Sequence, residues 1–207
     1  MEKNLSSFGF VRKLFVKSVE GREQSVSPVF SGLAGNGAIA FLLVDTSGSM
    51  YGEGIAQVKQ GVLDFTRTAL RKGYRTGLIK FDDYAVLLCE PTAHLSAIQA
   101  KVEDLRANGG TRLAPALAIA SQRLLGSRTH RVIVLATDGG TCDWVECLRT
   151  AETMKKDGVE ILAIGTTDAN WELLSKLVSR KDLNLKVEGN AFGKHGTQPR
   201  SNSRTYG

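Results

Sequence analysis

Blocks of apolar and polar residues alternate along the chain, and their spacing predicts strands and helices in turn. Three mainly apolar runs, 38–44, 132–136 and 159–164, have the composition of strands buried on both faces. Shorter strands are expected over 76–81, 85–89 and 183–187, with the second of these paired antiparallel to the first. Apolar residues at helical spacing predict helices over 55–72, 97–105, 115–125, 144–156 and 171–178. This alternation predicts an α/β fold.

Polar residues at the ends of these blocks supply local signals. Ser96 and Asn170 are expected to cap the helices that follow them, and Pro115 suits the first turn of a helix. Asp82-Asp83 lies between two expected strands. Paired carboxylates can serve catalysis, but a tight turn explains this pair more simply and is the preferred interpretation.

The pattern divides the chain into three parts. Residues 37–187 form the expected domain. Residues 1–36 contain apolar positions at helical spacing between basic ones, which is typical of a basic amphipathic helix, although a β-hairpin is an alternative. We expect this segment to pack on its own domain, and docking on a partner or a membrane surface is the less favoured outcome. Residues 188–207 are polar and are expected to form a flexible tail.

Composition limits the classes of function. The chain has 207 residues, is 42% hydrophobic and carries a formal net charge of +6. No apolar stretch reaches the roughly 18 residues of a membrane span. The charge is spread evenly along the sequence, so no nucleic-acid partner is expected. Three cysteines, Cys89, Cys142 and Cys147, are too few for a disulfide framework and favour the reducing cytoplasm.

Candidate chemistry begins where the first apolar run ends. Asp45, Ser47 and Ser49 follow that run at alternate positions, so a turning loop can direct one carboxylate and two hydroxyls to a single point. Oxygen ligands of this kind suit a hard divalent cation such as Mg²⁺. The simpler alternative is that these residues cap the next helix.

Two further oxygen-bearing residues occupy comparable places. Thr111 lies in the glycine loop 108–112, and Asp138 follows the second apolar run. In a doubly wound sheet, ligands bind beyond the carboxyl ends of the strands, where the strand order reverses. If the strands of Leu42 and Val134 are neighbours, Asp45 and Asp138 face the same crevice.

These three motifs together resemble those of the von Willebrand factor type A family. The matching stretches are Asp45-Thr46-Ser47-Gly48-Ser49, Gly109-Gly110-Thr111 and Thr137-Asp138-Gly139, in the family's order, and the resemblance covers about residues 37–187. It implies a Rossmann-like, doubly wound, mostly parallel sheet with one antiparallel edge strand and helices on both faces. It also implies a complete metal-ion-dependent adhesion site for Mg²⁺ or Mn²⁺. The metal residues would be Asp45, Ser47, Ser49, Thr111 and Asp138.

The resemblance also implies a mode of action. The three hydroxyl residues would bind the ion directly or nearly so, and the two carboxylates would act mainly through water. An ion held in this way keeps much of its charge and accepts an Asp or Glu from a partner protein. The family's small intracellular members often work in multiprotein systems or beside AAA+ ATPases, and a non-enzymatic, cytoplasmic interaction module is therefore expected.

Two other functions remain as alternatives. A metal-dependent phosphohydrolase could use the same ion, but it would need an acidic nucleophile or a second metal, and the first loop offers a single carboxylate. A membrane-surface adaptor could act through the basic N-terminal segment. The histidines, His94, His130 and His195, are distant from the motifs in sequence and are expected at the surface.

Overall fold

The structure, a computed structural model, describes residues 37–137, 140–166, 170–179 and 184–187. Within these residues a single sheet has the strand order β3-β2-β1-β4-β5-β6, with β3 antiparallel at one edge and the other neighbours parallel. The strands are β1 (Ile39–Asp45), β2 (Arg75–Phe81), β3 (Ala85–Thr92), β4 (Arg131–Thr137), β5 (Val159–Thr166) and β6 (Asn184–Val187). The expected mostly parallel sheet with one antiparallel edge strand is confirmed.

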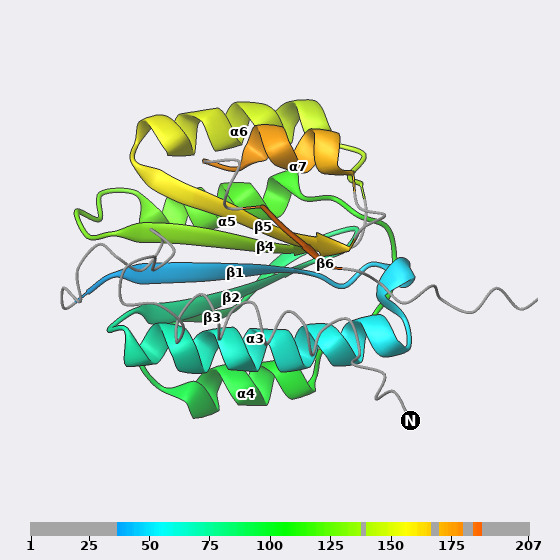
Figure 1. Ribbon diagram of the computed structural model, residues 1–207, viewed down its shortest axis with the longest axis horizontal. Helices are drawn as coiled ribbons and strands as arrows, with labels where there is room; N and C mark the ends of the chain where they lie inside the picture. Colours follow the sequence, from blue (N-terminus) through cyan, green and yellow to red (C-terminus); the bar gives the residue numbers. More distant parts are fainter. Residues whose placement is uncertain (1–36, 138–139, 167–169, 180–183, 188–207) are drawn as a thin grey trace, which may run out of the picture.

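Helices cover both faces of the sheet (Figure 1). They are α3 (Glu53–Arg71) and α4 (Leu95–Glu103) on one face, and α5 (Ala114–Leu124), α6 (Trp144–Lys156) and α7 (Trp171–Leu177) on the other. A short 3₁₀ turn, η1 (Gly48–Met50), precedes α3. Within the described residues, no helix is both long and apolar enough to cross a membrane.

Strand β1 lies in the middle of the core because its side chains serve both faces. Phe41 and Leu43 belong to the cluster under α5 and α6, whereas Leu42 and Val44 belong to the cluster under α3 and α4. All four are at most 2% exposed. A β-carbon on Gly77 of the neighbouring strand would come within 2.3 Å of the Phe41 ring, so the absence of a side chain there makes room for the ring.

Helix α3 is held to the sheet by one apolar stripe. Val58, Val62, Phe65 and Ala69 recur at intervals of three or four residues and are each at most 3% exposed. Because the helix runs antiparallel to β1, its last turn lies beside the amino end of the sheet, and Gly73 with a positive φ of 81° turns the chain into β2.

Most of the predicted elements are confirmed with small changes in their bounds, and α6 has the predicted bounds. The cap at Asn170 is confirmed, since its Oδ1 accepts a hydrogen bond of 3.1 Å from the N–H of Leu173.

The predicted cap at Ser96 is wrong. Helix α4 begins at Leu95, and Ser96 lies within its first turn, because the preceding turn is closed by Thr92 Oγ1, which accepts from the N–H of His94. Residues 1–36 and 188–207 lie outside the described residues.

Candidate metal centre

The site lies where the strand order reverses, at the carboxyl ends of β1 and β4. These strands are parallel neighbours in the register Val44 to Ala136, as the sequence argument required. The side-chain hydroxyl of Thr137 donates a 2.6 Å hydrogen bond to Asp45 Oδ2 across the junction of the two strands. The last residue of β1 and the last residue of β4 are therefore joined directly.

Asp45 is the central carboxylate of this junction. It is 0% exposed, and its Oδ1 accepts a 2.8 Å hydrogen bond from the N–H of Ser47. That bond turns the chain sharply after β1. The helix-capping alternative fails here, because Ser47 forms no side-chain cap bond with η1, and the residue before α3 is Gly52, which has no side chain. Asp45 therefore shapes the loop and does not cap a helix.

The two serines present adjacent hydroxyls at this turn. Ser47 Oγ and Ser49 Oγ are 3.0 Å apart; Ser47 is 2% exposed and Ser49 is exposed. Ligand oxygens about 2.0–2.1 Å from Mg²⁺ in an octahedral shell are separated by roughly 2.9 Å along each edge. The spacing and chemistry of these hydroxyls therefore fit neighbouring ligands of a small, hard cation.

The glycine loop is bonded to the loop that carries the serines. The N–H of Gly48 donates to the carbonyl of Gly109 at 2.9 Å, and the N–H of Asn108 donates to the carbonyl of Thr46 at 2.8 Å. These two bonds fix the segment that leads to Thr111, which is half-buried. Thr111 is thus brought to the same end of the sheet as Asp45, Ser47 and Ser49.

The loop after β4 is bonded to the same glycine loop. The carbonyl of Thr111 accepts from the hydroxyl of Thr141 at 3.1 Å and from the N–H of Cys142 at 3.3 Å. Four of the five predicted site residues therefore lie on loops that are bonded to one another. The fifth, Asp138, lies outside the described residues, between Thr137 and the loop that contacts Thr111.

Asp82 and Asp83 do more than make the turn predicted for them. Asp82 Oδ2 accepts from Lys80 Nζ at 2.7 Å and from the Thr46 hydroxyl at 3.2 Å. Asp83 Oδ1 accepts from the N–H of Gly110 at 2.9 Å. A β-carbon at Gly110 would lie 2.8 Å from that same oxygen, so the glycine allows the close approach. The turn between β2 and β3 therefore clamps the glycine loop from one side.

Asp143 clamps the glycine loop from the other side. It occupies the position before α6, yet its carboxylate forms no cap bond with that helix. Instead Oδ1 accepts from the N–H of Leu113 at 3.1 Å and Oδ2 from the N–H of Ala114 at 3.2 Å. Asp143 thus caps α5, the helix that follows the Thr111 loop, and ties it to the loop after β4.

Ionisation follows from these contacts. Burial alone would raise the pKa of the Asp82 carboxyl, but hydrogen bonds from Lys80, Tyr84 and Thr46 and the charge of Lys80 outweigh it and lower the pKa.

Burial raises the pKa of the Cys147 thiol well above its usual range, and the nearby Asp143 raises it further. Cys147 is therefore a neutral thiol. The described residues contain no group of three His, Cys, Asp or Glu side chains suited to a metal.

Comparisons with known proteins agree with this geometry. Residues 40–140 match the family profile described as "von Willebrand factor type A domain". The mouse (Mus musculus) protein "Collagen alpha-6(VI) chain" is 30% identical over an alignment of 146 residues, which covers 64% of this chain and 6% of that protein. These findings support the assignment of this domain to the von Willebrand factor type A (vWA) family. Such domains are generally interaction or adhesion modules.

Solved structures of low sequence identity share the fold of this domain. BatB from Bacteroides thetaiotaomicron is similar with a TM-score of 0.64 and 14% identity, over 73% of this chain and 91% of that one. Proximal thread matrix protein 1 from the mussel byssus, in a structure with a zinc-occupied MIDAS motif, gives a TM-score of 0.60 and 20% identity. That similarity covers 73% of this chain and 41% of that one.

Sequence reasoning missed the residues that hold the loops in place. Thr137 was noted only as part of a motif, Asp83 was explained as part of a local turn, and Asp143 was not singled out. Their partners are 27 to 92 residues away, from Asp83 to Gly110 and from Thr137 to Asp45. No local signal identifies such partners. A carboxylate directly before a helix has the sequence position of that helix's cap, even when it accepts hydrogen bonds from another helix.

Proposed function

We propose that this chain is a metal-dependent protein-interaction module that grips an Asp or Glu of a partner protein. The metal would be Mg²⁺ or Mn²⁺, held by Ser47, Ser49 and Thr111, with Asp45 and Asp138 acting mainly through water. The observation that carries the proposal is the pair of adjacent hydroxyls of Ser47 and Ser49 after the buried Asp45, on a loop that is bonded to the loop of Thr111. When bound, the ion would supply an electrophilic position that a carboxylate oxygen can complete.

The protein's own part is to fix the oxygens before any ligand arrives. Asp45 is held by the Thr137 hydroxyl on one oxygen and by the Ser47 N–H on the other. Because outer carboxylates of this kind orient the direct ligands, they strengthen binding without neutralising the ion fully. The zinc-occupied MIDAS motif of the mussel protein, which shares this fold, supports a metal at the corresponding end of this domain.

A carboxylate partner is the ligand that this chemistry favours. Serine and threonine hydroxyls are neutral, so an ion bound to them would keep much of its positive charge. An incoming Asp or Glu would supply the missing negative charge, whereas a neutral side chain would not. The partner itself, and an AAA+ ATPase or other multiprotein system as its setting, are part of this proposal.

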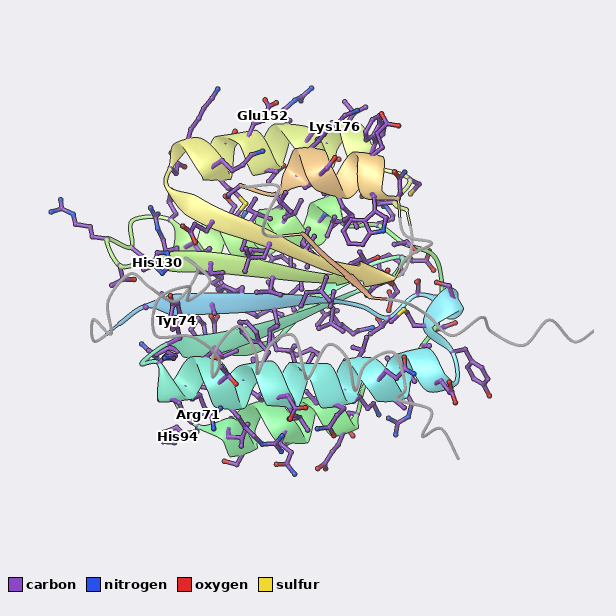
Figure 2. All side chains as sticks on the ribbon, in the orientation of Figure 1. Arg71, Tyr74, His94, His130, Glu152 and Lys176 are labelled. Carbon is purple, nitrogen blue, oxygen red and sulfur yellow. The ribbon has the colours of Figure 1, made fainter. Side chains whose placement is uncertain are left out.

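We also propose a non-enzymatic and cytoplasmic role. General acid–base chemistry commonly uses a histidine at the site. Within the described part of the chain, His94 and His130 precede α4 and β4, at the opposite end of the sheet (Figure 2). The three cysteines are free thiols in the structure, which suits a reducing compartment.

Capture of partners with and without a chelator tests this function. The tagged full chain would be incubated with lysate of the source cells in Mg²⁺ and in EDTA. The sharpest variant is Asp45→Asn, because the amide keeps the shape and can still accept from Ser47 N–H while the charge is lost. The matched control is Asp64→Asn, which removes a surface carboxylate paired with Arg67 at 2.8 Å.

The proposal expects the same partner bands with wild type and Asp64→Asn in Mg²⁺, and their loss in EDTA or with Asp45→Asn. Addition of free acetate should not restore them. If wild type and Asp45→Asn capture equally in both buffers, metal-dependent adhesion is wrong for this chain.

A further inference from the structure

Basic side chains gather at the end of the sheet opposite the candidate metal centre. We define the amino-end surface as residues 71–75, 126–131 and 155–160, which join α3 to β2, α5 to β4 and α6 to β5. These ranges hold seven Lys or Arg side chains against two acidic ones, Asp157 and Glu160. Figure 2 shows Arg71, Tyr74 and His130 together at this end. Charge that is evenly spread along the sequence is therefore concentrated in space.

The fold brings the three ranges into one surface. The carbonyl of Ala38 accepts from the N–H of Arg75 at 2.7 Å, and the N–H of Ile39 donates to the carbonyl of His130 at 2.9 Å. Arg75 and Arg131 are both paired in register with Ile39, one on each side of β1. Their α-carbons are thus separated by about two strand spacings, or roughly 10 Å. Arg131 in turn reaches the carbonyl of Asp157.

The charges of this surface are not neutralised within the described residues. Its one ion pair there joins His130 to Glu160 at 3.4 Å, and none of its seven Lys or Arg side chains takes part in one. At the carboxyl end the opposite holds for Lys80 and Arg112, which are paired with Asp82 and Asp143 at 2.7 and 3.7 Å. The amino-end surface therefore keeps a net positive field.

Helix ends explain some of these cations but not all of them. The carboxyl ends of α3, α5 and α6 carry partial negative charge, which favours nearby cations such as Arg71 and Lys156. Arg131 follows the same logic, since its guanidinium donates to the carbonyls of Leu124 and Asp157 at two helix ends. Arg75 and Arg128 are exposed on a strand and a loop, where no helix end requires them.

The N-terminal segment enters the domain at the same surface. A β-carbon on Gly37 would lie 3.2 Å from Thr129 Cγ2, so the chain arrives beside Arg128. The sequence of residues 1–36 adds five basic and three acidic side chains. Between residues 8 and 19 it has the amphipathic basic pattern, with Leu14 and Phe15 among its apolar positions. A second positive and partly apolar element is thus covalently attached where the basic surface lies.

We propose that the amino-end surface docks the domain on an anionic phospholipid bilayer. A broad negative plane is complementary to cations that come from several segments, and peripheral membrane binding commonly combines a polybasic patch with an amphipathic segment. Docking by this surface turns the candidate metal centre away from the bilayer, toward the aqueous phase and a protein partner. The membrane role stands independently of the metal role.

Vesicle co-sedimentation of the full chain tests the proposal. The probes are vesicles of phosphatidylcholine alone and vesicles of phosphatidylcholine mixed with phosphatidylserine. The test variant is the double reversal Arg75→Glu and Arg128→Glu. The matched control is Lys101→Glu and Arg149→Glu, which changes the net charge equally at exposed positions of α4 and α6 outside the surface. The milder pair Arg75→Gln and Arg128→Gln serves if the reversal unfolds the domain, as judged by circular dichroism.

Wild type and the control variant should bind the vesicles that contain phosphatidylserine and should not bind those of phosphatidylcholine alone. The double reversal should bind at least about twentyfold more weakly, since each basic group near an anionic surface contributes on the order of fivefold. Raising the salt above 0.1 M, where the screening length is about 10 Å, should release the protein, whereas EDTA should not. Equal binding by the reversal and the control would overturn the proposal. So would binding of a mixed-sequence RNA, lost in the reversal, without any binding to vesicles.

Discussion

The two ends of the sheet are built from the same strands and helices, yet they handle charge in opposite ways. At the carboxyl end, the aspartates accept hydrogen bonds from the backbone of neighbouring loops, and Lys80 and Arg112 are paired with them. At the amino end, the seven arginines and lysines have no carboxylate partners among the described residues. The charged groups of the carboxyl end are therefore paired within the domain, whereas the cations of the amino end remain available to an external ligand.

This difference has a physical origin in the connections. Loops at the carboxyl end come from β1, β2, α4 and β4, and each is bonded to another, so its polar groups are used to hold geometry. Connections at the amino end are short turns that follow helix carboxyl ends, where positive side chains are favoured locally. Loops that are bonded to one another suit a preorganised binding site. Short turns that carry unpaired cations suit an electrostatic docking surface.

The two ends also respond to opposite extremes of pH. The pKa of Asp82 is lowered by its partners, so its contribution to stability is present above its unfolded pKa and is lost as the pH falls. At the amino end, burial and then the charge of Glu160 raise the pKa of Tyr74 from 10.0 to about 12. The contribution of the neutral Tyr74 hydroxyl to stability is complete below pH 10 and is lost as the pH rises through about 12.

The largest expected effect comes from the core that both ends share. Phe41 lies in the middle of β1 and is fully buried. Phe41→Ala should lower the free energy of unfolding by about 3–5 kcal/mol, because it removes a large side chain from a close-packed site. Denaturant unfolding followed by circular dichroism measures this loss. The control is Tyr84→Ala, which truncates a ring that is 75% exposed and should change little.

Tyr74 distinguishes the amino end from the rest of the molecule. Its hydroxyl lies 2.6 Å from His130 Nδ1, and the side chain is 2% exposed. The rise of the Tyr74 pKa from 10.0 to about 12 corresponds to about 2–3 kcal/mol of stability, lost between pH 10 and pH 12. Unfolding free energies measured across that interval should fall in wild type and fall less in Tyr74→Phe. An unchanged slope in this variant would show that another group controls the alkaline loss.

Asp143 tests whether the carboxyl-end loops act as one unit. Asp143→Ala removes the acceptor for two N–H groups at the start of α5 and should cost about 1–2 kcal/mol of stability. Because the same carboxylate ties the Thr111 loop to the loop after β4, Mn²⁺ affinity should fall as well. Asp104→Ala, which changes an exposed carboxylate after α4, is the matched control. A fall in stability without any fall in Mn²⁺ affinity would limit Asp143 to helix capping.

Asp83 gives the smallest effect on stability and the most selective effect on the site. It is exposed, and its Oδ1 accepts a hydrogen bond from the Gly110 N–H at 2.9 Å. Asp83→Ala should change stability by less than about 0.5 kcal/mol. It should weaken Mn²⁺ binding by about tenfold, because Gly110 adjoins Thr111 and outer contacts of this kind orient ligands. Asp83→Asn keeps an acceptor and should restore most of the affinity, so equal losses in both variants would contradict the clamp.

The sequence predicted most of the fold because periodicity is a local property. The apolar run 38–44 and the stripe of Val58, Val62 and Phe65 each fix a strand or helix from neighbouring residues alone. The wrong cap at Ser96 shows the limit of such signals, since several residues near a helix start can serve as its cap. In that case Thr92, further upstream, organises the turn.

The candidate site was predicted from motifs, but its supports were not. Asp45, Ser47 and Ser49 could be named because they follow a strand end at alternate positions, and Thr111 because it lies in a glycine loop. The clamps by Asp83 and Asp143 depend on how loops distant in sequence meet, which no local pattern encodes. The basic amino-end surface escaped the sequence for the same reason, because Arg75 and Arg128 are 53 positions apart and meet only in the fold.

Direct titration of the purified chain with Mn²⁺, followed by electron paramagnetic resonance, tests the central claim that the carboxyl end holds a divalent ion. Wild type and the Asp64→Asn control should each bind one ion per chain, and Asp45→Asn should bind at least about tenfold more weakly while keeping its fold by circular dichroism. Mg²⁺ should displace the bound Mn²⁺. Equal Mn²⁺ binding by wild type and Asp45→Asn, or no binding by wild type, would contradict the account.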